Sequence, residues 1–532
     1  MSKRTGLTAG LLVASGVLAL AGAAEAQPKR GGDLVMIGVA GSPRHLNGAV
    51  QSGVATAQPS TQIFASLVRY DDKWNALPYL AKSWELSPDG KALTFKLVDN
   101  AVFHDGRPVT SADVAFSIMT VKANHPFQTM LAPVTGVDTP DPLTAVLRFE
   151  KPHPAAMLAL STALAPILPK HVYDDGTDVK VHARNATPVG SGPFKLAEFK
   201  AGEHIVLERF DKFFIPGRPY LDRIIIRIMN DQAAMVIGME RQELHVYPLS
   251  TNPRNVERLG QQGHLVVTDK GYDGIGPINW LAFNTKKPPL DRKEVRQAIS
   301  YAIDREFITK RLMAGMAKIA TGPIMNGTPF YTDGVEPYRL DLDKANALLD
   351  QAGLKRGADG NRMALSIDFI PTGGPDQQKN VAEYLKPQLK KIGIDLTVRT
   401  APDFPTWAQR VGGWDFDMTM DNVFNWGDPV IGVHRTYLSS NIRKGVIWSN
   451  TQQYSNTTVD DLLEKAQVEI DPAKRKAHYV AFQRQVVEDA PIAFINVSPF
   501  YTIYHKNLAN PPLSIWGTMA PFDEVYWEAP PK

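Results

Sequence analysis

Side chains suited to holding a small solute gather between Phe416 and Ser440. Phe424 and Trp426 flank Asn425, and such rings can stack on another ring, an aliphatic chain or a sugar face. Arg435 can hold a carboxylate through charge-assisted hydrogen bonds. Three further polar residues of this segment are Asn422, Asp428 and His434. The segment therefore predicts ligand binding, and a plain surface loop is the alternative for His434 and Arg435.

Signatures of catalysis and of metal binding are missing from the sequence. It has no Walker loop, no HExxH, no dinucleotide glycine fingerprint and no cysteine. The histidines do not pair at i, i+4 in a zinc-like arrangement. Gly190 directly precedes Ser191, whereas a nucleophile elbow needs one residue between its first glycine and its serine. We predict no enzyme activity, no metal and no cofactor, and the competing class is an exported hydrolase acting on peptides or sugars.

The elements that must position the 416–440 segment indicate an α/β fold. Two predicted strands alternate apolar residues, at Leu365, Ile367 and Phe369 and then at Ile394, Leu396 and Val398. A helical pattern containing Val381, Leu385 and Leu389 lies between them. Strand, helix and strand at this spacing form a βαβ unit, which predicts parallel strands.

Charged residues follow another predicted helix that begins with Asp291 as its N-cap. Arg296, Asp304 and Arg305 occur at helical spacing near its apolar stripe. Charges at such spacing usually lie on a solvated face, so we predict that these three residues are exposed and have no catalytic role.

The N-terminus predicts export. Residues 1–26 combine Lys3 and Arg4, an apolar stretch and an Ala24-Glu25-Ala26 exit, which together are typical of a cleaved signal peptide. A membrane anchor is the alternative, although glycines dilute the apolar stretch. Without cysteine no lipid can be attached after the signal, so we predict a soluble periplasmic protein. The net charge of +3 favours neither nucleic acid nor a membrane surface as a partner.

The stretch from Leu80 to Lys122 carries a family resemblance. Pro88-Asp89-Gly90 forms a turn between two strand patterns, and a second turn follows from His104 to Pro108. Thr110 and Asp113 then match a capping box that begins a helix. In this order the stretch resembles the signature segment of the family 5 extracellular solute-binding proteins, the peptide/nickel-type receptors of ABC importers.

The resemblance implies the type II periplasmic binding protein fold, with two lobes, a hinge near Asn284 and Val497, and a small accessory subdomain in the first lobe. The expected divisions are a signal peptide (1–26), lobe I (27–75), the accessory subdomain (76–188), lobe I again (189–284), lobe II (285–497) and a return to lobe I (498–532).

The resemblance also implies a ligand site. A loop after the first strand should line the cleft, and it contains Ser42, Pro43, Arg44 and His45. The strand that crosses between lobes supplies Trp280 and Asn284. In the second lobe the expected ligand contacts are Asn422, Phe424, Asn425, Trp426, Asp428 and Arg435.

Asn425 marks a departure from the family. Peptide-binding relatives have an aspartate three residues before the acidic residue of a D-P or E-P pair, and that carboxylate holds the ammonium of the peptide. Asp428 and Pro429 form the pair here, so the position falls on Asn425. A neutral amide cannot make the charge-assisted bond that a buried ammonium needs. We therefore predict that peptides with a free N-terminus are not favoured.

The implied function is solute capture for an ABC importer. The ligand binds between the lobes and stabilises a closed form, which docks on permease subunits that cytoplasmic ATPase subunits drive. A small peptide is the default ligand, and opine-like compounds, oligosaccharides and metal chelates are alternatives within the family. The protein is expected to be a monomer.

Overall fold

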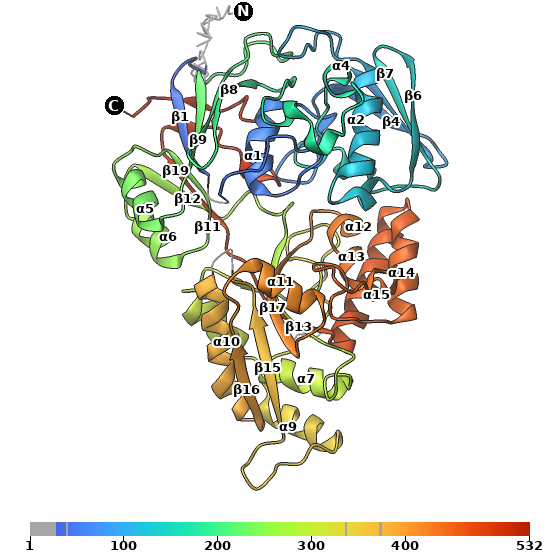
Figure 1. Cartoon of the computed structure of the whole chain (residues 1–532), viewed down its shortest axis with the longest axis vertical. Coiled ribbons are helices and arrows are strands. Elements are labelled where there is room, and N and C mark those ends of the chain that lie inside the picture. The colour runs from blue at the N-terminus through green and yellow to red at the C-terminus, as the bar shows by residue number, and fades with distance from the viewer. Residues whose placement is uncertain (1–27, 39–40, 336–337, 372–374, 532) are drawn as a thin grey trace, which may run out of the picture.

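The computed structural model describes residues 28–38, 41–335, 338–371 and 375–531, so the predicted signal peptide lies outside the described residues (Figure 1). Within these residues, a seven-stranded and a four-stranded sheet build what we call the first lobe, and a six-stranded sheet builds the second lobe. In Figure 1 the first lobe is the upper half and the second lobe is the lower half.

The seven-stranded sheet combines strands from distant parts of the chain. Its order is β12 (Leu265–Thr268), β19 (Tyr501–His505), β11 (Val246–Ser250), β1 (Asp33–Gly38), β10 (Arg223–Ile228), β9 (His204–Arg209) and β8 (Phe194–Lys200). β1 pairs in parallel with β10 and β11. The helices of this region are α1 (Val54–Ile63), α5 (Gln232–Glu240) and α6 (Pro253–Gly260).

The six-stranded sheet has the order β14 (Lys318–Ile319), β18 (Ile492–Val497), β13 (Pro277–Phe283), β17 (Met418–Phe424), β15 (Met363–Phe369) and β16 (Ile394–Arg399). One apolar core includes Leu281 and Phe283 of β13, and another includes Ile278 and Trp280 of the same strand. Because side chains alternate along a strand, the two cores lie on opposite faces of the sheet. The second lobe also contains α7 (Lys293–Ala302), α9 (Leu342–Gln351), α10 (Pro375–Lys390), α11 (Phe404–Gly412), α12 (Pro429–Gly432), α13 (His434–Tyr437), α14 (Thr457–Val468) and α15 (Pro472–Asp489).

The predicted βαβ unit is confirmed. β15 pairs in parallel with β16, with Leu365 opposite Leu396, and α10 connects them. Val381, Leu385 and Leu389 of α10 are buried in the core of the second lobe, as their spacing predicts.

The signature segment forms an antiparallel hairpin and a capped helix. The four-stranded sheet has the order β4 (Ala81–Leu86), β5 (Ala92–Leu97), β7 (Thr144–Phe149) and β6 (Val134–Asp141). The capping box of α2 (Ser111–Asn124) is confirmed, since Thr110 N donates to Asp113 Oδ2 at 2.8 Å. His104, in the turn between the hairpin and α2, also contacts the chain at residues 190–192. Its backbone N donates to Gly190 O at 2.8 Å, and its ring Nε2 lies 3.1 Å from Gly192 O.

The glycines of the Gly190-Ser191-Gly192 turn permit close packing against α1. A Cβ at Gly190 would lie 1.9 Å from Ile63 O, and one at Gly192 would lie 2.3 Å from Gln62 O. Gly192 N donates to Ile63 O at 2.8 Å, which satisfies a carbonyl at the end of the helix. The turn therefore joins the end of α1 to the signature segment.

Two expectations for the helix after β13 are wrong. α7 begins at Lys293 with Arg292 at the N-cap position, so Asp291 does not cap it. Arg296 and Arg305 are buried, with 6% and 7% of their surface exposed. Arg296 donates to Ala490 O at 3.1 Å, and Arg305 donates to Phe494 O at 2.6 Å. Buried arginines can satisfy several carbonyls at once because the guanidinium has five donors.

The division of the chain into lobes stays a proposal, and strand pairing suggests one change to it. β13 pairs with β17 and β18 of the second lobe along its length. We therefore propose the change of lobe before Pro277 and not after Asn284.

A substitution at Gly190 tests the packing of this turn. We expect Gly190→Ala to destabilise the protein by about 3 kcal/mol or more, because the new Cβ has to displace the end of α1. Gly136→Ala is the control, since a Cβ there meets nothing within 4 Å and the cost should stay below about 1 kcal/mol. Urea unfolding measures both, and equal stability of the two variants would contradict this account.

Candidate functional site

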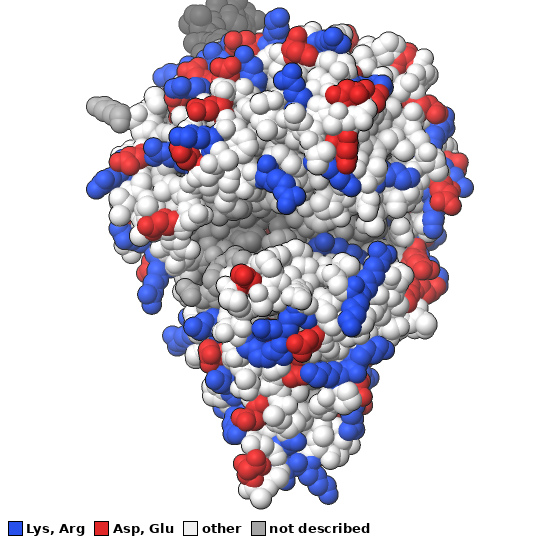
Figure 2. Space-filling model, in the orientation of Figure 1, with Lys and Arg blue, Asp and Glu red and all other residues white. Residues whose placement is uncertain are grey.

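The chain passes between the two lobes through residues 269–276 and 498–500, which connect β12 to β13 and β18 to β19. Figure 2 shows a hollow between the upper and lower halves of the molecule. These connections meet the end of the six-stranded sheet at which β13 begins and β18 ends.

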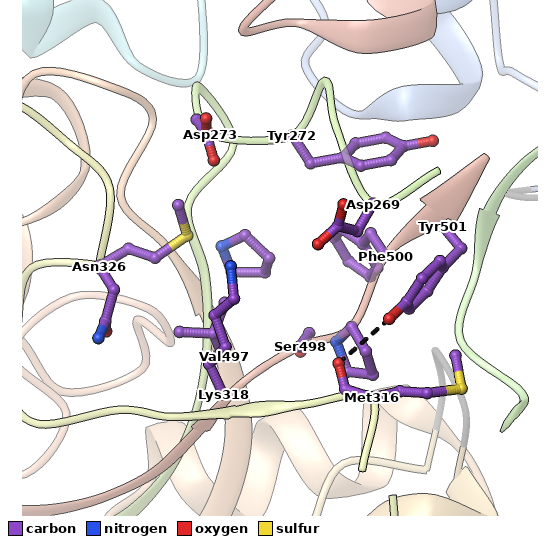
Figure 3. A pocket seen from close by; sticks show the side chains of 13 residues that line it. Asp269, Tyr272, Asp273, Met316, Lys318, Asn326, Val497, Ser498, Phe500 and Tyr501 are labelled. Carbon is purple, nitrogen blue, oxygen red and sulfur yellow. Dashed lines mark hydrogen bonds between the residues drawn. The ribbon is translucent and has the colours of Figure 1, made fainter. Parts of the chain in front are cut away.

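A cavity of about 70 Å³ lies beside both connections (Figure 3). Its lining includes Tyr272 and Asp273 from the first connection, Ser498 and Phe500 from the second, and Asn326 of the second lobe. Burial raises the pKa of Asp273, and nearby Lys318 opposes this rise. The volume suffices for a few water molecules.

Asn422, a predicted contact, adjoins this cavity. Ser498 Oγ donates to Asn422 Oδ1 at 3.2 Å, and Gln378 Nε2 lies 3.4 Å from the same oxygen. Gln378 in turn donates to Asn279 Oδ1 at 2.8 Å. Asn279, Gln378 and Ser498 were missed by sequence reasoning, because they lie near Asn422 only through strand pairing and the position of α10.

Phe424 and Trp426 lie between the lobes. The Trp426 ring centroid is 5.0 Å from that of Phe127 in the first lobe and 6.4 Å from that of Trp516. The Phe424 ring lies 6.4 Å from that of Phe500. Trp426 is 5% exposed, whereas Phe424 is half-buried. Trp426 thus joins the lobes, and Phe424 keeps a partly free face.

Arg435 is a cation whose hydrogen-bond donors are only partly occupied by the described residues. Its guanidinium lies 5.2 Å from the centroid of the Phe127 ring, and its Nε donates to Gly432 O at 3.3 Å. Its two terminal nitrogens have no hydrogen bond within the described part of the chain. Burial lowers the pKa of Arg435 to about 10, with Asp421 opposing the shift, so the group is cationic at neutral pH.

Asp421 is fully buried beside this cation. Trp448 Nε1 donates to one carboxylate oxygen, and Asn422 N donates to the other at 2.6 Å. Burial raises the pKa of Asp421 to about 7, although these hydrogen bonds and Arg435 favour the charged form. Its carboxylate is therefore engaged inside the second lobe.

Asn425 does not present its amide to the space between the lobes. Nδ2 donates to Pro323 O at 3.1 Å, and Oδ1 accepts from Met325 N at 2.7 Å. The residue is 2% exposed. Both halves of the amide hold a backbone loop of the second lobe, and contact of Asn425 with a ligand stays a prediction.

Asp428 is likewise used internally. Its two oxygens accept from Arg475 at 2.7 and 2.7 Å, and both side chains are nearly fully buried. Burial would raise the pKa of Asp428, but the guanidinium of Arg475 outweighs this effect and lowers it. His434 bonds the Tyr479 hydroxyl at 3.0 Å. Asp428 and His434 thus have partners inside the second lobe, and their contact with a ligand stays a prediction.

Trp280 and Asn284 have structural roles as well. Trp280 is 5% exposed and packs in a core of the second lobe. Asn284 Nδ2 donates to Trp414 O and Phe416 O, both at 3.1 Å. Asn284 follows the end of β13 that points away from the first lobe, whereas the sequence analysis expected a hinge near it. The position of the hinge stays a prediction.

The loop after β1 is only partly open. Ser42 and Arg44 are exposed, whereas Pro43 and His45 are buried. Ser42 Oγ accepts from Gly202 N at 3.0 Å, and His45 Nδ1 accepts from Asn47 N at 3.3 Å. Contact of this loop with a ligand stays a prediction, and Arg44 is its most accessible polar residue.

Comparison with known proteins settles the family. The family described as bacterial extracellular solute-binding proteins, family 5, middle, matches residues 75–445, more than half of the 532-residue chain. The chain belongs to this family. Family 5 proteins are the binding components of transporters and not enzymes, so this protein is the substrate-binding component of a peptide/nickel-type ABC importer.

Two relatives match along most of the chain. The oligopeptide-binding protein AppA of Bacillus subtilis is 27% identical over 491 residues, which cover 88% of this chain and 87% of that protein. The dipeptide-binding protein of Escherichia coli is 26% identical over 505 residues, covering 88% and 90%. The crystal structure of the ABC transporter substrate-binding protein CtaP from Listeria monocytogenes has a TM-score of 0.81 and 26% identity, covering 94% of this chain and 100% of that chain. The type II periplasmic binding protein fold expected from the family 5 resemblance is thereby confirmed.

The described residues contain neither a helix long and apolar enough to cross a membrane nor a group of three or more potential metal ligands.

Replacing Asp428 tests its internal role. We expect Asp428→Asn to lower the free energy of unfolding by about 3–5 kcal/mol at pH 7, because Arg475 is left buried without its counter-charge. Since the folded state holds the pKa of Asp428 low, this contribution is present above about pH 4 and is lost as the pH falls further.

Urea unfolding at several pH values measures this effect. Asp138→Asn is the control, because its ion pair with Arg148 is more than half exposed and should contribute less than about 1 kcal/mol. Similar losses in both variants would show that Asp428 has no special structural role.

Proposed function

We propose that this protein is exported to the periplasm, captures a small peptide or peptide-like solute between its lobes, and delivers it to permease subunits driven by cytoplasmic ATPase subunits. The observation that carries the proposal is a cavity at the lobe junction, lined from both connections and from the second lobe. The relatives named as oligopeptide- and dipeptide-binding proteins support the peptide class.

The charges near the junction favour a ligand with a carboxylate. Arg435 keeps free terminal nitrogens among the described residues, and a guanidinium binds a carboxylate through paired hydrogen bonds. Phe424, which is half-buried near Phe500, supplies an apolar surface at the junction. Closure would desolvate both contacts and so strengthen the electrostatic one.

The ammonium of an ordinary peptide has weaker support. Asn425 is neutral and engaged, Asp428 pairs with Arg475, and Asp421 accepts from Trp448. Asp269 and Asp273 remain near the cavity, but Asp269 is exposed and Asp273 lies in the field of Lys318. Blocked peptides and opine-like compounds combine a carboxylate with neutral groups, so they are the second ligand class to consider.

Acetylation of a test peptide decides between these ligand types. We expect trialanine with an N-acetyl group to bind at least as well as trialanine with a free amine, because a buried ammonium loses hydration worth several kcal/mol. Isothermal titration calorimetry on the purified protein gives both dissociation constants. Tight binding of the free amine that disappears on acetylation would contradict the proposal.

Arg435 provides an independent test. We expect Arg435→Gln to weaken binding of N-acetyl-trialanine by roughly 10- to 150-fold, the loss of one charge-assisted contact worth about 1.5–3 kcal/mol. Arg443→Gln is the control, because Arg443 is exposed and belongs to the same segment of the second lobe. The same titration measures both variants. Equal affinities would remove Arg435 from the site.

A further inference from the structure

A row of amide side chains crosses the six-stranded sheet near the first lobe. Asn422 of β17 lies opposite Asn279 of β13, which lies opposite Asn496 of β18. Residues directly opposite each other on neighbouring strands place their side chains on the same face. Gln378 of α10 lies against this row and donates to Asn279 Oδ1 at 2.8 Å. We call Asn279, Gln378, Asn422 and Asn496 the amide row.

The amide row adjoins the cavity at the lobe junction. β13 begins at Pro277 and β18 ends at Val497, so the row lies at the end of the sheet from which the chain passes to the first lobe. Ser498, which lines the cavity in Figure 3, donates to Asn422 Oδ1 at 3.2 Å. Ser498 therefore connects the cavity to the amide row.

Two acceptors of the row have no hydrogen-bond partner among the described residues. Gln378 Oε1 and Asn496 Oδ1 are buried and have no hydrogen-bond partner in the part of the chain that the structure describes. Gln378 is 2% exposed and Asn496 is 0% exposed, so bulk water does not solvate these oxygens. An unpaired buried carbonyl carries a desolvation penalty, and such a group in a native protein calls for a missing partner.

We propose that the amide row is a subsite for neutral N–H or O–H donors of the transported solute. This inference rests on the proposed function and specifies which ligand groups the site selects. The donors are backbone or side-chain amides of a blocked peptide, or hydroxyls of a sugar-like group, since both present the same hydrogen-bonding chemistry to a carbonyl oxygen.

The chemistry of the row disfavours other ligand groups. A ligand carboxylate has only acceptor oxygens, so it could not donate a hydrogen bond to Gln378 Oε1 or Asn496 Oδ1. An ammonium would enter a buried site with no carboxylate in the row to balance its charge. An apolar group would leave both oxygens unpaired. A site with buried polar groups discriminates strongly against analogues that lack the matching donors.

Three probes separate the possible donors. Calorimetry of the full chain with N-acetyl-trialanine, with its analogue N-methylated at the amides, and with maltotriose tests amide and hydroxyl donors separately. If amides are the donors, we expect N-methylation to weaken binding by about ten-fold or more. If hydroxyls are the donors, maltotriose binds and the peptides do not.

Variants of the row connect this selectivity to named residues. We expect Gln378→Met and Asn496→Leu each to weaken the bound probe by about ten-fold or more. Gln378→Met also removes the hydrogen bond to Asn279 Oδ1, so we expect its thermal midpoint to fall, whereas Asn496→Leu removes only a bond to Val497 O besides its unpaired oxygen and should stay closer to the wild-type midpoint. Gln388→Leu is the matched control: Gln388 is a buried amide on the same helix that contacts Tyr384, and its loss should leave affinity unchanged.

The outcomes are distinguishable. Wild-type affinity in both row variants would overturn the inference while leaving the proposed function intact, since the row would then be structural. Equal binding of the methylated and unmethylated peptides would also overturn it. Failure of the wild-type protein to bind any of the three probes would contradict the proposed function and the inference together.

Discussion

Two backbone hydrogen bonds at the lobe junction determine where most of the site lies. Asn425 N donates to Gly276 O and Trp426 N donates to Ile275 O, both at 3.1 Å. They tie the segment after β17 to the connection that enters β13. Gly276 has a φ of 61°, and a Cβ there would lie 2.8 Å from Asn425 Cβ, so glycine allows this approach. The position of this segment in turn determines where Trp426, Asp428 and Arg435 lie.

Some polar side chains of that segment bond other parts of the protein, and others keep donors without a partner among the described residues. Asn425 holds the 323–325 loop, and Asp428 holds Arg475. Both interactions are buried, and removing one partner of such an interaction costs more than the interaction itself contributes. Arg435 differs because its Nε bonds one carbonyl while its terminal nitrogens have no partner among the described residues. A rigid set of internal bonds thus supports one cation whose remaining donors are free for a solute.

The cavity at the junction is small for a peptide, at about 70 Å³. Trp426 already packs against Phe127 and Trp516 across the junction. These aromatic contacts join the two lobes at the junction. A solute that replaces these contacts stabilises a closed form only by the free energy that its own contacts contribute in excess of the contacts it replaces.

Local sequence patterns determined much of the fold. Alternation and helical spacing predicted the βαβ unit of β15, α10 and β16, and the Thr110–Asp113 capping box predicted the start of α2. These features depend on neighbours in the sequence, so they can be derived without tertiary contacts. The order of turns and strands in the signature segment was also sufficient to indicate the family.

Tertiary structure alone decided which polar residues are free. Arg296 and Arg305 have a helical spacing typical of exposed charges. Both are nevertheless buried, and both donate to carbonyls of strands and loops that are distant in the sequence. Asn425 and Asp428 occupy the expected segment, but Met325 and Arg475 engage them from more than 40 residues away in the sequence. The amide row arises in the same way, from three strands and one helix that meet only in the folded sheet. A sequence specifies which groups can bond, whereas burial and long-range pairing decide which of them remain available to a ligand.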